Sequence, residues 1–263
     1  RILRENGYVT GGFGKWHLTP DNVQGAAGPF DHWPKSWGFD HWWGFLSGAA
    51  GQYDPIITMD DSTIGVPEGK AGEQYYFPDD ITEKSIEWLR AVRAQDTQKP
   101  WMMYYSTGCA HAPHHVAPEW ADKYKGTFDD GWDALRERTL ARQKDLGIVP
   151  QDTELTERPD IFPAWDSLTD AQKTLYTRQA EVYAGYQDNA DWNVGRLLDE
   201  VDRYRENHRV DDPAGLHTTH RVMQHAVTGE VDECFGKSRA EPLTAAGGRD
   251  QRDCGHQDLA ASV

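Results

Sequence analysis

A helix followed at once by a buried strand constrains the fold of this chain most. Residues 78–95 have apolar side chains at helical spacing, namely Ile81, Ile86, Leu89 and Val92. Asp80 and Glu83 predict a capping box at the start of this helix. The next segment, WMMYYSTG at 101–108, is apolar as in a strand buried on both faces. We therefore expect an α/β fold, with functional residues in the loop after this strand.

Further segments fit a central sheet with flanking helices. Residues 2–5 indicate a helix end and 8–13 a short buried strand, while 119–148 predict two helices around the turn TFDDGW. Helical spacing of apolar residues predicts a long helix over about 170–203. Residues 20–55 are rich in Gly, Pro and aromatic residues, so we expect irregular loops there. The tryptophans within 33–45 favour a core patch, and a carbohydrate-stacking surface is the alternative.

Composition excludes several partners. The formal net charge of the 263 residues is −16, which argues against binding to nucleic acid or to an anionic membrane surface. No apolar run reaches the roughly 20 residues of a membrane span. The three cysteines form no CxxC pair and do not fix the redox compartment. Because the chain begins with Arg rather than Met, we expect a longer protein, and its localisation stays open between cytoplasm and export.

Two short segments carry the candidate catalytic chemistry. In GKWHL, Lys15 and His17 are two residues apart, so on an extended chain their side chains would point to the same side. The segment is then either a solvated loop or a binding site for an anionic group. In HAPHH, three histidines lie within five residues and could bind zinc, pack, or meet a substrate anion. Pro113 breaks any helix, which disfavours the zinc interpretation. His111 is best placed because it is nearest to the end of the predicted strand.

Four ordered blocks resemble the type I sulfatases, in particular the bacterial arylsulfatase group. They are GYVTGGFGKWHLTP, AGPFDHWPKSWGFDHWWGFLSG, YKGTFDDGWDALRERTLARQKDLGIVP and EVYAGYQDNADWNVGRLLD, which fall within residues 3–203. The resemblance implies part of an alkaline-phosphatase-like sulfatase fold. It also implies hydrolysis of a small-molecule sulfate monoester to an alcohol or phenol plus inorganic sulfate. The cofactors implied are calcium and a formylglycine made from Cys or Ser in a C/S-x-P-x-R motif.

The resemblance also assigns roles to individual residues. Lys15 matches the family lysine that contacts the sulfate and the hydrated formylglycine. His17 matches the histidine that serves this diol as a base, and His111 matches the histidine near the leaving-group oxygen. His114 and His115 match no catalytic position.

Several family features are absent from the sequence. No C/S-x-P-x-R motif occurs, and the residues after Cys109, Cys234 and Cys254 do not complete one. The family's acidic pair would precede Arg1, the D-N-G motif and the distal lysine are missing, and Asp188-Asn189 inside the predicted long helix is a poor substitute. We therefore expect no calcium ligands and little or no activity from this chain alone.

The residues group into two predicted parts. Residues 1–204 would be a partial sulfatase catalytic domain, and residues 205–263 lose apolar periodicity and predict a divergent tail, disordered or read out of frame. These features indicate an internal piece of a sulfatase. Two alternatives stay open: a phosphodiesterase or phosphonate hydrolase of the same superfamily, and a non-catalytic glycan-binding module that uses residues 33–45.

Overall fold

The computed structural model describes residues 1–67 and 74–206. By their contacts these residues form two compact units, which are described separately. The first unit comprises residues 1–127 and 175–197, and the described part of the second comprises 128–174 and 198–206. The tail predicted over 205–263 lies almost wholly outside the described residues.

A five-stranded mixed sheet forms the centre of the first unit, with the order β4-β3-β2-β1-β5. The strands are β1 (Val9–Lys15), β2 (His41–Phe45), β3 (Ile57–Met59), β4 (Ser62–Ile64) and β5 (Trp101–Ser106). β1 pairs in parallel with both β2 and β5, and β3 and β4 continue the sheet antiparallel. The α/β class expected from the sequence is confirmed.

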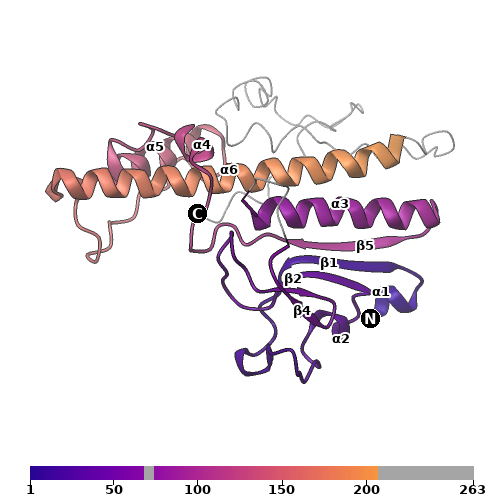
Figure 1. Ribbon diagram of the computed structural model, residues 1–263. Helices are drawn as coiled ribbons and strands as arrows, with labels where there is room; N and C mark the ends of the chain where they lie inside the picture. The colour runs from indigo at the N-terminus through magenta and orange to yellow at the C-terminus, as the bar shows by residue number, and fades with distance from the viewer. Residues whose placement is uncertain (68–73, 207–263) are drawn as a thin grey trace, which may run out of the picture. The chain divides into compact units, whose positions relative to one another are not determined.

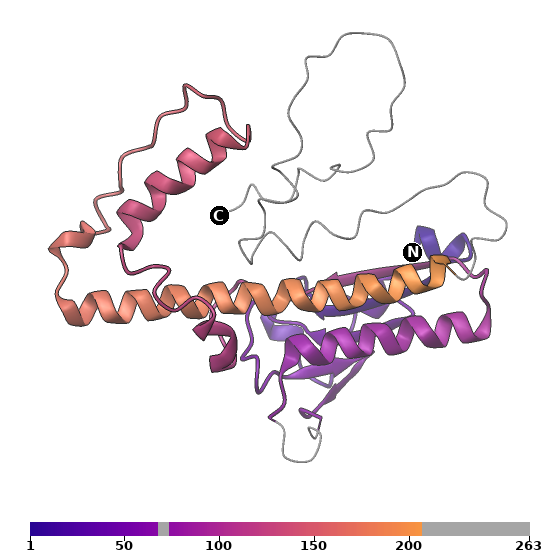
Figure 2. The ribbon, with the colours of Figure 1, turned by 90° about the horizontal axis from the view of Figure 1, so that it is seen from above.

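Helices flank this sheet. Figure 1 shows α3 lying along β5 and beside α6, with the short α1 and α2 on the other side of β1. Figure 2 again shows α3 and α6 side by side. The first unit contains α1 (Ile2–Glu5), η1 (Asp21–Val23), α2 (Pro34–Trp37), α3 (Phe77–Gln95), α4 (Pro118–Asp122) and residues 175–197 of α6 (Asp170–Glu206).

Two hydrophobic clusters bury the strands. The first consists of Phe13, Trp43, Phe45, Ile57, Phe77 and Ile81. The second consists of Trp16, Trp33, Phe39, Trp42 and Leu46. Because Trp33 and Trp42 are fully buried, they belong to the core, and the alternative of a carbohydrate-stacking surface is wrong for both. Trp37, between them, is half exposed.

The aromatic stretch 20–55 differs from its predicted loop structure. It contains η1, α2 and the strand β2, whose last four residues are all buried. A strand that packs on both faces has no alternation of apolar and polar residues, so periodicity could not reveal it. The hairpin of β3 and β4 was likewise not expected, since each of its strands spans only three residues.

The start of α3 also differs from the predicted capping box. The helix begins at Phe77, and its N-cap residue Tyr76 makes no side-chain capping hydrogen bond. The Asp80 carboxylate instead accepts hydrogen bonds from Trp43 Nε1 and from the Tyr75 hydroxyl, each at 2.8 Å. Both bonds satisfy the carboxylate, and the one from Trp43 ties α3 to β2.

The second unit contains α5 (Gly131–Asp145) and η2 (Trp165–Ser167). The rings of Trp132 and Trp165 meet edge to face, with centroids 4.9 Å apart. The two helices predicted within 119–148 are confirmed as α4 and α5, and the long helix as α6. No helix of the described residues has the length and apolar character needed to cross a membrane.

Candidate active site

The carboxyl ends of the three parallel strands place the candidate residues. Lys15 is the last residue of β1 and lies level with Phe45 of β2, while Gly14 lies level with Ser106, the last residue of β5. The segments that carry His17 and His111 leave the sheet from this edge. In parallel α/β sheets this is the edge at which ligands bind.

Glycines at two positions let the strands approach closely beside Lys15. A Cβ on Gly14, whose φ is +110°, would lie 1.8 Å from the carbonyl oxygen of Ser106. A Cβ on Gly44 would lie 1.9 Å from the carbonyl oxygen of Gly14. Any side chain at either position would collide with backbone atoms, so Gly14 and Gly44 are required by the sheet itself.

Lys15 and His17 do not follow the simple alternation of an extended chain. β1 ends at Lys15, and His17 has a left-handed φ of 57°. Between them, the buried Trp16 donates a hydrogen bond from Nε1 to the His32 carbonyl oxygen at 2.9 Å. The backbone N–H of His17 donates to the carbonyl oxygen of Leu46 at 3.0 Å. Trp16 therefore anchors the segment. The directions of the Lys15 and His17 side chains are set by the end of β1 and by the left-handed backbone at His17.

Lys15 is half-buried, and within residues 1–67 and 74–206 its ammonium group makes no hydrogen bond or ion pair. The exposed His17 ring lies against Gly48, where a Cβ would be only 2.5 Å from Nε2. A cation without a carboxylate partner attracts an anionic ligand more strongly than a paired one would.

His111 lies in the loop between β5 and α4 and is exposed. Its Nδ1 is 2.7 Å from the carbonyl oxygen of Ala112, a contact that requires the proton on Nδ1. Its backbone N–H donates to the carbonyl oxygen of Gly108 at 3.0 Å. Nε2 is therefore the ring nitrogen available to a ligand.

The other two histidines of HAPHH pack against tyrosines. The His114 ring meets the Tyr183 ring edge to face, with centroids 4.9 Å apart. The His115 ring stacks on Tyr53 at 5.4 Å, and its Nδ1 accepts a hydrogen bond from the Gln52 N–H at 3.2 Å. The three histidines thus diverge, and the described residues contain no group of three or more His, Cys, Asp or Glu side chains that could hold a metal ion.

Cys109 is adjacent to this site but is not suited to act as a nucleophile. Burial raises the pKa of the Cys109 thiol to about 12. Its Sγ lies 3.6 Å from the carbonyl oxygen of Tyr186, so the thiol is directed into the protein. At neutral pH the reactive thiolate would be rare.

The residues present do not fit a calcium site. Calcium takes six to eight oxygen ligands, mostly carboxylates. The predicted candidates at the carboxyl edge are a lysine and two histidines, and Asp188 lies on α6, paired with Lys123 at 2.9 Å. In the part of the chain that the structure describes, the calcium ion implied by the family therefore has no set of ligands. The formylglycine implied by the family has no precursor there either.

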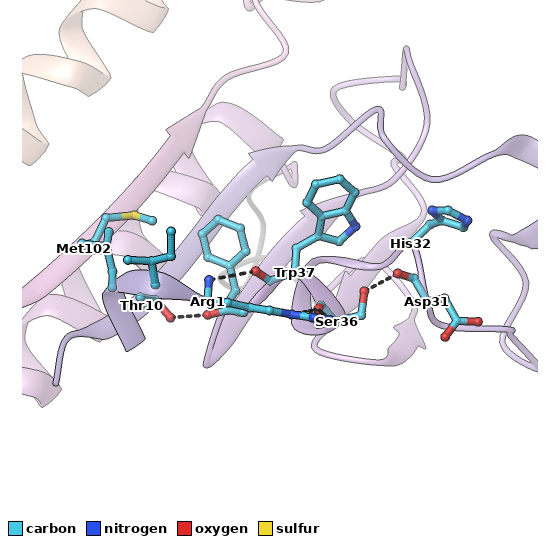
Figure 3. A pocket seen from close by; sticks show the side chains of 11 residues that line it. Arg1, Thr10, Asp31, His32, Ser36, Trp37 and Met102 are labelled. Atoms are coloured by element: carbon cyan, nitrogen blue, oxygen red, sulfur yellow. Dashed lines mark hydrogen bonds between the residues drawn. The ribbon is translucent and has the colours of Figure 1, made fainter. Parts of the chain in front are cut away.

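A cavity of about 630 Å³ lies elsewhere in the first unit (Figure 3). Its lining includes Thr10 and Met102, which stand near the starts of β1 and β5. Figure 3 shows the α-amino group of Arg1 donating to the Trp37 carbonyl oxygen, a contact of 3.2 Å. The cavity contains none of the candidate catalytic residues and lies toward the opposite ends of the strands.

The fold and this edge define an α/β protein that gathers a lysine and imidazoles at the ends of parallel strands. Residues 1–210 match the model of the sulfatase family, and the chain therefore belongs to that family.

Two named relatives and one solved structure are similar to this chain. The arylsulfatase of Klebsiella aerogenes is 27% identical over 206 residues, which cover 76% of this chain and 42% of that protein. The N-acetylglucosamine-6-O-sulfatase of Bacteroides thetaiotaomicron is 27% identical over 254 residues, covering 78% and 41%. A solved structure of a protein in complex with its substrate D-glucosamine-2-N,6-O-disulfate is 24% identical, with a TM-score of 0.45, over 77% of this chain and 45% of that one. The chain spans less than half the length of these relatives.

Proposed function

We propose that this chain supplies the anion-contacting wall of a sulfatase active site that hydrolyses small sulfate monoesters. The observation that carries the proposal is the ammonium group of Lys15 at the carboxyl edge of β1, which has no ion-pair partner among the described residues and lies next to segments that bear exposed imidazoles. A sulfate ester is anionic, and its cleavage builds further charge on the bridging oxygen. Cations and a proton donor around the sulfuryl group lower the barrier.

Each residue has a separate proposed task. Lys15 contacts the sulfate oxygens, and His17 acts as a base toward the diol that the family resemblance implies. His111 holds a proton at Nε2 and gives it to the leaving-group oxygen, so that an alcohol or phenol departs uncharged. The Nδ1 contact of His111 with the Ala112 carbonyl oxygen supports this task, because it occupies Nδ1 and leaves Nε2 free to face the ester.

We place the substrate in the aryl sulfate class. The block YKGTFDDGWDALRERTLARQKDLG resembles the bacterial arylsulfatase group, and the Klebsiella aerogenes relative carries the name arylsulfatase. A cavity of about 330 Å³ lies beside the loop after β2 and is lined mostly by small and apolar residues, including Leu46, Ala49 and Pro55. Ser47 and Ala49 in this lining flank Gly48, which contacts His17, so the cavity offers room for the organic part of an ester.

Sulfate binding by the chain tests the proposal. Titration with sodium sulfate at constant ionic strength, followed by NMR, should give a dissociation constant that Lys15→Ala and His111→Ala each raise about fivefold. This corresponds to about 1 kcal/mol for a partly exposed charge-assisted contact. Phosphate in place of sulfate measures discrimination against the phosphoester alternative.

Matched controls lie at the other end of the sheet. Lys99 precedes β5 and His32 lines the cavity of Figure 3. Lys99→Ala and His32→Ala should leave the dissociation constant within twofold of the parent value. Equal weakening by Lys15→Ala and Lys99→Ala would show a non-specific charge effect and contradict the proposed site.

A further inference from the structure

The position of His111 depends on the loop that carries it. Among the described residues its hydrogen bonds are with Gly108 and Ala112, both in the same loop. Its ring is exposed and does not pack into the core. The ends of the loop must therefore determine where the imidazole stands.

His115 fixes the far end of this loop through three contacts. Its Nδ1 accepts a hydrogen bond from the backbone N–H of Gln52 at 3.2 Å. Its carbonyl oxygen accepts one from the Tyr76 hydroxyl at 2.9 Å, and its ring lies nearly parallel to that of Tyr53, at an interplanar angle of 19°. These contacts join the loop to the segment after β2 and to the start of α3.

Gln52 is itself held firmly and also meets the near end of the loop. It is 2% exposed, and its carbonyl oxygen accepts a hydrogen bond from Phe77 N–H at 2.8 Å. Its Nε2 donates to the Ala50 carbonyl oxygen at 2.7 Å. A Cβ on Gly108 would lie 3.1 Å from the same Nε2. One buried residue thus contacts both ends of the loop that holds His111.

We propose that His115 is a positioning residue, which fixes where His111 stands at the carboxyl edge of the sheet. The inference rests on the proposed function, in which His111 is the proton donor. Only three residues separate the two histidines, and one is Pro113 with its restricted φ, so a shift at His115 is transmitted to His111. The contact with Gln52 requires His115 to be neutral, with its proton on Nε2.

Three substitutions of His115 distinguish the role of its Nδ1 as a hydrogen-bond acceptor from the role of its ring in stacking on Tyr53. In His115→Asn the side-chain oxygen replaces Nδ1 and can still accept from Gln52 N–H. In His115→Gln the oxygen lies near the position of Nε2 and cannot. His115→Phe keeps a ring to stack on Tyr53 but has no acceptor. Circular dichroism and the thermal midpoint of each variant establish that the chain is folded.

The ¹⁵N resonances of the histidine rings are the primary measurement. In the parent chain, His115 should show an unprotonated Nδ1 and a protonated Nε2, and His111 should show a proton on Nδ1. His115→Gln and His115→Phe should shift the His111 signals toward those of a free imidazole, whereas His115→Asn should preserve them. If His115 only stabilised the fold, the substitutions would lower the thermal midpoint, but His115→Asn would not selectively preserve the His111 signals.

Sulfate affinity provides the functional measurement. His115→Gln should raise the dissociation constant for sodium sulfate about as much as His111→Ala does, and combining the two should add little. Unchanged His111 resonances in His115→Gln would overturn the positioning role. If those resonances respond but His111→Ala leaves sulfate affinity unchanged, the proposed function fails while the positioning of the loop stands.

Discussion

At the scale of single residues, two glycines determine how Lys15 is presented. Gly14 and Gly44 bring three parallel strands together without side chains between them, directly before the strand end that bears the lysine. A larger residue could not be accommodated by rotating a side chain, because the colliding atoms belong to the backbone.

Gly14→Ala should lower the free energy of unfolding by more than about 3 kcal/mol, since it combines a left-handed φ with a steric collision. Gly25→Ala is the matched control, because a Cβ there would meet nothing within 4 Å, and it should change the free energy by less than about 0.5 kcal/mol. Urea unfolding followed by tryptophan fluorescence measures both. Similar midpoints for the two variants would show that the strands can separate at no cost.

At the scale of elements, α6 carries a carboxyl group that is unfavourable in its charged form. Burial, and secondly the charge of Asp188 one turn earlier, raise the pKa of Asp191 to about 6. The folded protein therefore holds this proton more tightly than the unfolded chain. The contribution of Asp191 to stability falls as the pH rises from the ordinary value of 3.8 to about 6.

Asp191→Asn should therefore raise the free energy of unfolding at pH 7.5 by about 1 kcal/mol, a value discounted for solvent screening because the group is only half-buried. At pH 4 the same substitution should have little effect. Thermal unfolding at both pH values, with the exposed Asp152→Asn as control, provides the measurement. A stabilisation that is equal at pH 4 and pH 7.5 would contradict the titration of Asp191.

Elements with one clear apolar stripe or run were predictable. The helix expected over 78–95 is α3, Phe77–Gln95, and the apolar run from 101 gives β5. β2 was not predictable, because its burial on both faces removes the alternation that marks a strand. Along the long helix α6, the apolar residues Tyr186 and Leu197 are buried, whereas Leu175 is exposed.

The candidate site was predictable only in part. Lys15 and the histidines could be selected because cations and imidazoles suit an anionic ester. The contact between Gln52 and His115 spans 63 positions in the sequence and follows no period, so only the folded arrangement reveals it. The left-handed conformation of His17 has no local glycine signal either.

At the scale of the whole molecule, the sequence lacks a C/S-x-P-x-R motif, and the half-buried Cys109 has a thiol whose pKa desolvation raises to about 12. The purified chain should therefore hydrolyse p-nitrophenyl sulfate no faster than buffer, with or without added calcium. The absorbance of released nitrophenolate measures this, with an active arylsulfatase as the positive control. Calcium-dependent turnover by the chain would overturn the expectation.

The contact between His17 and Gly48 links two positions that are 31 residues apart in the sequence. With the imidazole of His17 in its present position, a Cβ at 48 would lie 2.5 Å from Nε2, so a side chain there requires the exposed ring to move away. Once the ring is replaced by a small side chain, that restriction is lifted. Substitutions at positions 17 and 48 should therefore be coupled, with a larger residue at 48 costing less in a chain that has a small side chain at 17.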